Sequence, residues 1–137
     1  MTVLLKKHDY YKILSYAQEK LPNEACGLLA GLIDGGIKSI EEVYHLTNVD
    51  QNPEHFSMDP QEQFAAIKQI RSKGWVLLGN LHSHPSSPSS PSKEDVKFAF
   101  DSEASYLILS LQDKGHPMLK SFRIKEKAVT EEKLYLI

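Results

Sequence analysis

An apolar run that ends in two histidines limits the possible fold more than any other feature of this chain. Residues 75–81 read Trp-Val-Leu-Leu-Gly-Asn-Leu, which is too apolar for a half-exposed strand and predicts a buried central one. Pro85 has no amide hydrogen to give to a sheet, so the strand ends there. Side chains at the end of a central strand lie at the rim of a cleft, and the histidines occupy that place.

His82 and His84 have the spacing of a metal-ligand pair. Residues two apart on a strand point to the same face, with Cα atoms about 7 Å apart, so both imidazoles reach one ion while Ser83 faces away. A third protein ligand would leave the fourth tetrahedral position to water, the arrangement of catalytic zinc. Asp95 follows a short loop and is well placed for this role. We therefore predict one Zn²⁺ per chain.

The segment between the histidines and Asp95 allows two interpretations. Residues 86–91 are only Ser and Pro, which predicts an exposed, flexible loop. Ser92 and Asp95 then have the spacing of a helix capping box, at the start of a predicted helix that buries Val96, Phe98, Ala99 and Phe100. Beside a His-x-His strand end the metal-ligand interpretation of Asp95 is favoured. The remaining histidines are predicted to be ordinary surface or hydrogen-bonded core residues: His8, His45, His55 and His116.

Other metal-dependent hydrolase folds fit poorly. An amidohydrolase barrel needs about 250 residues, and this chain has 137. The metallo-β-lactamase pattern needs an Asp-His pair after the second histidine, where Pro85 and Ser86 stand. A zinc deaminase needs a pair of cysteine ligands, and Cys26 is the single cysteine.

The pattern His-Ser-His-Pro, six residues, Ser-x-x-Asp closely resembles the JAMM (MPN+) zinc metalloprotease family in its compact prokaryotic form. Further agreement lies in Glu24 at the start of an apolar run, in residues 56–60 and in Gly79. The resemblance covers roughly residues 3–125. Asn80 and Leu81 depart from it, because eukaryotic members tend to carry aromatic residues there.

The resemblance implies a role for each residue of the motif. His82, His84 and Asp95 would be zinc ligands, Glu24 the general acid/base, and Ser92 the donor that stabilises the oxyanion. Spacing alone does not select Glu24, because the chain offers other glutamates. The implied fold is a mixed α/β (α+β) domain of three layers, in which helices flank a mixed, mostly antiparallel sheet of the cytidine-deaminase-like type.

The local patterns agree with one such domain over residues 1–137. Helices are predicted over about residues 10–21, with Tyr10, Ile13, Leu14, Ala17 and Leu21 on one face, and after Asp59, with Phe64, Ile67 and Ile70 buried. A hairpin is predicted with strands after Glu24 and from Ile37 to Val49, and Glu41-Glu42 indicates a bulge. Buried and half-exposed strands are predicted at residues 106–111 and 119–125.

Composition restricts the partners. The formal net charge of −2, without a basic stripe, argues against nucleic acid. Residues 2–5 are too few for a signal sequence, so neither secretion nor membrane spanning is expected, and the cytoplasm is the predicted location. Cys26 is interpreted as a small buried hydrophobic residue, with zinc ligation or redox sensing as the alternative.

The family resemblance implies a zinc metallopeptidase or isopeptidase that acts at the C-terminal tail of a ubiquitin-like protein. In a prokaryotic setting the partner would be a sulfur carrier of the ThiS/MoaD type. Two alternatives stay open: a zinc hydrolase of small amides, and a non-catalytic MPN-type interaction module. The oligomeric state does not follow from the sequence.

Overall fold

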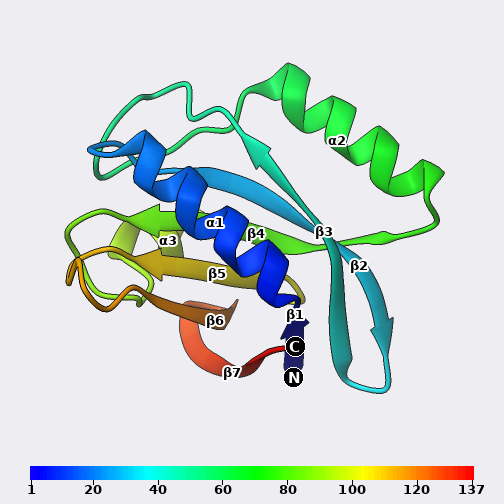
Figure 1. The fold of residues 1–137 in the computed structure, drawn as a ribbon. Coiled ribbons are helices and arrows are strands. Elements are labelled where there is room, and N and C mark those ends of the chain that lie inside the picture. The colour runs from blue at the N-terminus through cyan, green and yellow to red at the C-terminus, as the bar shows by residue number, and fades with distance from the viewer.

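The chain folds around one mixed β-sheet. The computed structural model describes residues 1–137. The strands are β1 (Thr2–Leu5), β2 (Cys26–Asp34), β3 (Ile37–Leu46), β4 (Val76–His84), β5 (Ser105–Ser110), β6 (Met118–Lys125) and β7 (Ala128–Leu136). The helices are α1 (Lys7–Lys20), α2 (Pro60–Ser72) and α3 (Lys93–Lys97). In space the strands follow the order β1-β3-β2-β4-β5-β6-β7, and parallel pairing of β1 with β7 closes the sheet (Figure 1).

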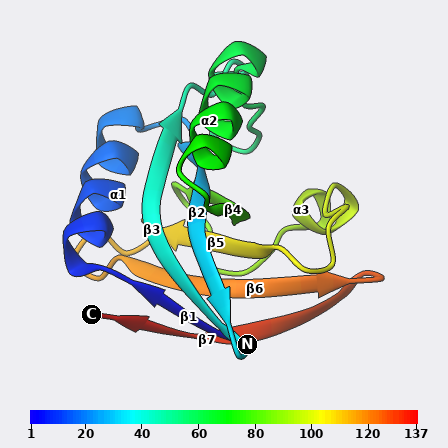
Figure 2. The same ribbon diagram turned by 90° about the vertical axis from the view of Figure 1, so that its right-hand side faces the viewer.

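Helices lie on both sides of this sheet. Figure 2 shows α1 on one side and α2 with α3 on the other. Four strand pairs are antiparallel, and three are parallel. The predicted fold class, a mixed and mostly antiparallel sheet flanked by helices, is therefore confirmed.

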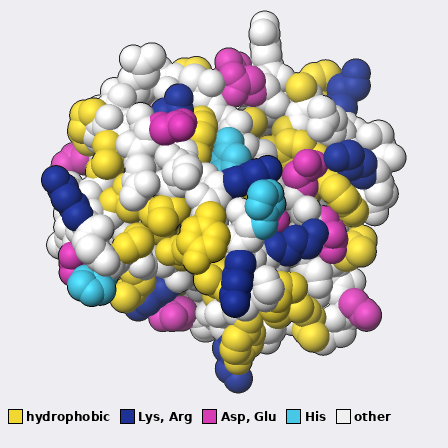
Figure 3. Space-filling view, viewed as in Figure 1, with side chains coloured by type: hydrophobic (Ala, Val, Ile, Leu, Met, Phe, Trp, Pro, Cys, Tyr) yellow, Lys and Arg dark blue, Asp and Glu magenta, His cyan; other side chains and the backbone are white.

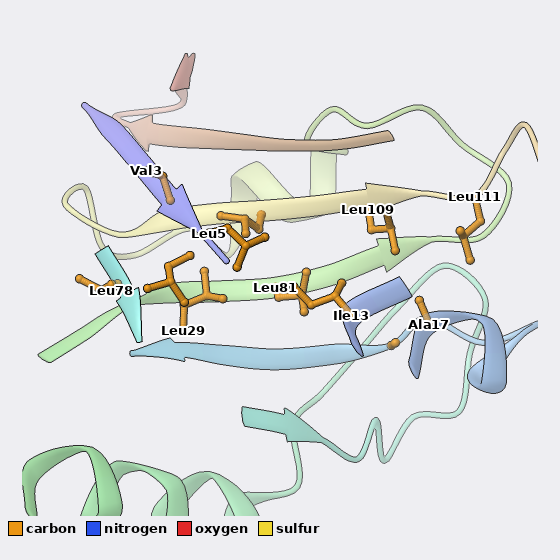
Figure 4. Close-up of a cluster of buried hydrophobic side chains, with 12 residues drawn as sticks. Val3, Leu5, Ile13, Ala17, Leu29, Leu78, Leu81, Leu109 and Leu111 are labelled. Carbon is orange, nitrogen blue, oxygen red and sulfur yellow. The ribbon is translucent and has the colours of Figure 1, made fainter. Parts of the chain in front are cut away.

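The two faces of β2 pack against different helices, because successive side chains of a strand point to opposite faces. Leu29 belongs to the main core cluster, together with Ile13 and Ala17 of α1 and Leu81 of β4 (Figure 4). Leu28 belongs to a second cluster that includes Ala66 of α2. β2 is thus held between two apolar layers, and its pairing with β4 positions the histidine-bearing strand.

β4 is central, as predicted, but its first residues are not buried. It pairs with β2 on one side and with β5 on the other. The pairing with β5 begins only at Gly79, opposite Ser105, so Val76 and Leu77 are 47% and 48% exposed. A Cβ at Gly79 would meet the Ser105 carbonyl oxygen at 1.8 Å, so only glycine allows this close approach of the backbones.

The hairpin of β2 and β3 contains the bulge indicated by the two glutamates. Ala30 pairs with Glu42 and Gly31 with Ile40, which leaves Glu41 as the extra residue. β3 ends at Leu46, so the predicted extension of this strand to Val49 is wrong.

α2 begins as predicted. Asp59 caps the helix by accepting a hydrogen bond from the Gln61 amide at 2.9 Å, and Pro60 is its first residue. The predicted burial of Phe64 is wrong, because the helix packs on the sheet through Ala66 and Ile70 and leaves Phe64 66% exposed.

Other apolar residues at helix ends are also exposed. α3 ends at Lys97, so the predicted helix does not continue through Phe100, and Phe98 and Phe100 are 56% and 85% exposed. Leu21 lies just after α1 and is 44% exposed, whereas Ile13 and Ala17 are buried as predicted. Phe122 and Ile124 of β6 face inward as predicted, and Lys125 is exposed.

Charges of both signs are mixed on the molecular surface seen in Figure 3, where Lys and Arg side chains stand among Asp and Glu side chains. None of the helices has the length and apolar character needed to cross a bilayer.

Candidate metal centre

Three side-chain atoms meet at the end of β4. The Nε2 atoms of His82 and His84 lie 3.1 Å apart, and the Oδ2 atom of Asp95 lies 3.1 Å from the first and 3.2 Å from the second. Ligand atoms around tetrahedral Zn²⁺, with metal bonds of about 2.0–2.1 Å, stand about 3.3 Å from one another. Two imidazole nitrogens and one carboxylate oxygen at this spacing therefore fit a zinc ion with one position left open. The structure brings all three predicted ligands together as a group able to hold a metal ion.

The register of β4 places the histidines. His82 pairs with Cys26 of β2 and with Ile108 of β5, and His84 pairs with Ser110 at the end of β5. Both imidazoles are almost fully buried, at 2% and 4% side-chain exposure. Phe56 stacks on the His82 ring, with the ring centroids 4.8 Å apart. Packing thus helps to fix the orientation of the rings.

His84 is also oriented by the loop that follows it. Its Nδ1 atom lies 2.9 Å from the Pro88 carbonyl oxygen, which leaves Nε2 to face the ligand group. Metal-binding histidines usually donate their second nitrogen in this way, because the contact fixes the tautomer and the ring orientation. The pKa of His84 is raised: burial lowers it, but contacts with Asp95 and the Pro88 carbonyl outweigh that effect.

The Ser/Pro loop is exposed at most of its positions, as its composition predicted, but it is also tied to β5. The Ser89 hydroxyl is buried and donates to the Ile108 carbonyl at 2.7 Å, and the Ser110 hydroxyl donates to the Ser87 carbonyl at 2.6 Å. Because both bonds tie the loop to β5, they hold the Pro88 carbonyl in reach of His84. The composition of the loop does not predict these two hydrogen bonds, because a serine hydroxyl can bond to any backbone group within reach.

Asp95 and Ser92 form the helix capping box that was the alternative to metal binding by Asp95. The structure shows that Asp95 can cap the helix and face the histidines at the same time. The Ser92 hydroxyl accepts a hydrogen bond from the Asp95 amide at 3.0 Å, and Asp95 Oδ2 accepts one from the Ser92 amide at 2.8 Å. That same Oδ2 atom faces both histidines. Burial disfavours the Asp95 carboxylate, but the contacts from His82, His84 and the Ser92 amide outweigh it and hold its pKa well below the usual range.

Glu24 lies just before β2 and is only 4% exposed. Its amide donates to the Asn52 carbonyl at 2.9 Å, and its own carbonyl accepts from Asn48 Nδ2 at 3.0 Å. Burial raises the pKa of the Glu24 carboxyl to about 8; nearby His84 lowers it and Asp95 raises it further. The carboxyl therefore lies within the electrostatic reach of the ligand group, and its pKa falls in the range of a general acid/base at neutral pH.

Ser83 connects Glu24 to the histidine strand. Its Oγ accepts the Ala25 amide at 2.8 Å, while its own amide donates to the Ala25 carbonyl at 3.0 Å. The side chain faces away from the ligands, as the strand period predicted. Its role in tying the residue after Glu24 to β4 was not predicted, because this pairing joins segments 58 residues apart in sequence.

Cys26 is not one of the residues that could hold the ion. Its thiol is fully buried and lies 3.6 Å from the Leu46 carbonyl oxygen. Burial raises the pKa of the thiol to about 12, so it stays protonated at neutral pH. The structure therefore supports the interpretation of Cys26 as a small buried hydrophobic residue.

A pocket of about 400 Å³ opens beside the ligand group. Its lining includes His82 and Asp95 and extends to the segment before α2, to Asn80 of β4 and to Tyr106 of β5. His55 and Glu94 face each other in this lining, with His55 Nδ1 and Glu94 Oε2 2.5 Å apart. His55, like His8, His45 and His116, lies outside the ligand group, as predicted.

Known proteins share this chain's sequence and fold. The family described as prokaryotic homologs of the JAB domain matches residues 6–125. A CysO-cysteine peptidase of Mycobacterium bovis is 32% identical over 125 residues, covering 91% of this chain and 84% of the relative. A desampylase of Haloferax volcanii is 35% identical over 103 residues, covering 72% and 73%.

Solved structures give the same result. A protein from Desulfitobacterium hafniense superposes with a TM-score of 0.90 at 52% identity, covering 100% of this chain and 93% of that one. A JAB1/MPN domain protein from Archaeoglobus fulgidus, at 21% identity, shares the fold with a TM-score of 0.59, over 98% of each chain. The curated relatives are a peptidase and a desampylase, which confirms the prediction of a hydrolase. The chain belongs to the prokaryotic JAB (JAMM/MPN) family.

Proposed function

We propose that this chain is a zinc-dependent peptidase that hydrolyses an amide bond at the C-terminal tail of a ubiquitin-like protein of the sulfur-carrier type. The observation that carries the proposal is the triangle of His82 Nε2, His84 Nε2 and Asp95 Oδ2, next to the buried carboxyl of Glu24. Relatives named as a CysO-cysteine peptidase and as a desampylase support this substrate class.

His82, His84 and Asp95 would hold the ion, which when bound supplies Lewis acidity to the scissile carbonyl and acidifies a water molecule. Glu24 accepts a proton from the attacking water and delivers it to the leaving nitrogen, so that water is consumed, the C–N bond breaks and a carboxylic acid and an amine result. A pKa of about 8 for the buried Glu24 carboxyl suits this exchange, because a group that titrates near the working pH both accepts and releases protons.

Ser92 is assigned to the oxyanion. Its hydroxyl oxygen accepts the Asp95 amide, so the hydroxyl hydrogen is free to donate toward the substrate. The side chain is exposed, and its neighbour Asp95 faces the histidines. A donor aimed at a developing oxyanion contributes about 10²–10³ in rate.

The test uses a ubiquitin-like sulfur carrier that bears residues after its Gly-Gly end. The carrier is incubated with the zinc-loaded protein and with the zinc-loaded Glu24→Gln variant, and the products are identified by mass spectrometry. We expect cleavage after Gly-Gly by the native protein and almost none by the variant, because glutamine cannot accept the water's proton.

Two outcomes would overturn the proposal. Hydrolysis of small amides only would favour a small-molecule hydrolase. Zinc and carrier binding without hydrolysis of either substrate would favour a non-catalytic interaction module.

A further inference from the structure

The wall of the pocket beside the metal centre carries a strong charge bias. Besides the ligand Asp95, it contains the carboxylates of Asp50, Glu54 and Glu94. No Lys or Arg lines it, and its one cationic candidate outside the ligand group, His55, is in contact with Glu94. Asp50 accepts a hydrogen bond from Ser57 Oγ at 2.8 Å, and neither Asp50 nor Glu54 has a basic partner within 4.0 Å.

The same pocket carries apolar surface. Phe56 stacks on the His82 ring, and Met58, Phe98 and Tyr106 complete the apolar part of the lining. Phe98 is 56% exposed and marks the outer rim. The pocket lining therefore combines apolar side chains with negative groups, which fits the hydrocarbon stem of a lysine better than a small anion.

The size of the pocket indicates which side of the cleaved bond it accepts. If the carrier tail ends in two glycines, as in the proposed function on which this inference rests, that tail has no side chains to fill a space of about 400 Å³. The pocket would then receive the group on the amine side of the bond, which is the part that leaves.

We propose that Asp50, Glu54 and Glu94 make the site selective for leaving groups without a free carboxylate next to the cleaved bond. Lysine side chains joined through an isopeptide bond, and internal peptide bonds, would meet this requirement. A single C-terminal amino acid would place its α-carboxylate among like charges, with no basic residue of the pocket to compensate.

The experiment compares three peptides that share one Gly-Gly tail. The first ends in Gly-Gly-Ala with a free carboxylate, the second is its C-terminal carboxamide, and the third joins Gly-Gly to the Nε atom of an acetyl-lysine amide. The zinc-loaded protein is assayed for kcat/KM on each. We expect the carboxamide and isopeptide to exceed the free acid by about fivefold or more at low salt, the size of like-charge repulsion at a partly exposed site.

Charge-neutral variants identify the residues responsible. In Asp50→Asn/Glu54→Gln, the ratio of carboxamide to free-acid kcat/KM should fall toward one. Asp34→Asn/Glu19→Gln is the matched control, because it removes the same number of exposed carboxylates away from the pocket and should leave the ratio unchanged. Raising the salt concentration should lower the ratio for the native protein and not for the pocket variant.

Binding separates failure of this inference from failure of the proposed function. The affinities of the same peptides for zinc-loaded Glu24→Gln, measured by calorimetry, should follow the same order. Equal cleavage and equal binding of acid and carboxamide, or preference for the free acid, would overturn the inference while leaving the peptidase intact. Binding in the expected order without any cleavage by the native protein would support the inference and count against the catalytic assignment.

Discussion

Asp95 Oδ2 accepts the Ser92 amide at 2.8 Å, and this is the same oxygen that faces both histidines of the metal centre. Ser92 in turn accepts the Asp95 amide, so the first turn of α3 closes on itself. The cap thus fixes the position of one ligand atom. A short helix of low intrinsic stability acquires a defined position through this pair.

The first prediction concerns metal content. The native protein should bind about one Zn²⁺ per chain at neutral pH, because three ligand atoms stand at the spacing of a tetrahedral site. His82→Ala and Asp95→Ala should each lose most of this binding. Elemental analysis after reconstitution and gel filtration measures it. His116→Ala is the control, since this exposed histidine pairs only with Asp113; equal zinc content in all four proteins would refute the ligand assignment.

The second prediction separates the two roles of Ser92. Ser92→Gly should cost only a few tenths of a kcal/mol in cap stability, because glycine is a tolerable N-cap, yet it removes the hydroxyl donor. Its kcat should therefore fall about 10²–10³-fold with zinc content unchanged. Ser92→Thr keeps both functions and should stay near the native rate. Full activity of the glycine variant in a peptide-cleavage assay would reduce Ser92 to a helix cap.

The third prediction concerns the pH dependence of stability in the metal-free protein. Glu24 ionises near pH 4.5 when unfolded and near pH 8 when folded, so between these values the folded state keeps a proton that the unfolded state has lost. The native protein should therefore lose stability as the pH rises through this window, and Glu24→Gln should not. We expect the two melting temperatures to agree near pH 4 and to differ by roughly 15 °C in favour of the variant near pH 8, because one pKa unit corresponds to about 1.4 kcal/mol and a domain of this size shifts by about 3–4 °C per kcal/mol.

Calorimetry in the presence of a chelator measures this difference. Glu19→Gln is the control for removal of one exposed glutamate, and it should follow the native curve. If the difference in melting temperature between the native protein and Glu24→Gln does not change with pH, the pKa of Glu24 is not raised in the folded protein.

The fourth prediction tests the loop that orients His84. Ser89→Ala removes the bond to the Ile108 carbonyl, which helps to hold the Pro88 carbonyl against His84 Nδ1. Because contacts of this kind typically contribute 10–100-fold to metal affinity, zinc affinity should weaken by about tenfold. Competition with a chromophoric chelator measures it. Ser90→Ala changes an exposed residue of the same loop and should bind zinc as the native protein does. If both variants lower the zinc affinity equally, the Ser89 hydrogen bond has no specific effect on the metal site.

The sequence alone determined the features that depend on local geometry. The two-residue spacing of His82 and His84 and the bulge at Glu41 follow from the strand period, and the Asp59 cap follows from the chemistry of a helix start. These patterns are readable because backbone dihedral preferences act over a few residues. They agree with the mixed fold class that the family resemblance implied, and they single out His82 and His84 as a pair of candidate ligands.

Tertiary structure decided what depends on partners far away in the chain. The pairing of β1 with β7 closes the sheet, and neither strand was predicted, because short edge strands carry little periodic signal. Only the packing of α2 shows that Phe64 is exposed, since a helix with several apolar faces can dock on any of them.

The same holds for the acid/base residue. Sequence spacing could not select Glu24 among the glutamates. Its burial beside the histidines depends on the contact of Ser83 with Ala25, which joins β2 to β4. Burial raises the pKa of a carboxyl only where the fold excludes water, so the property that suits Glu24 to its proposed role arises in the folded chain.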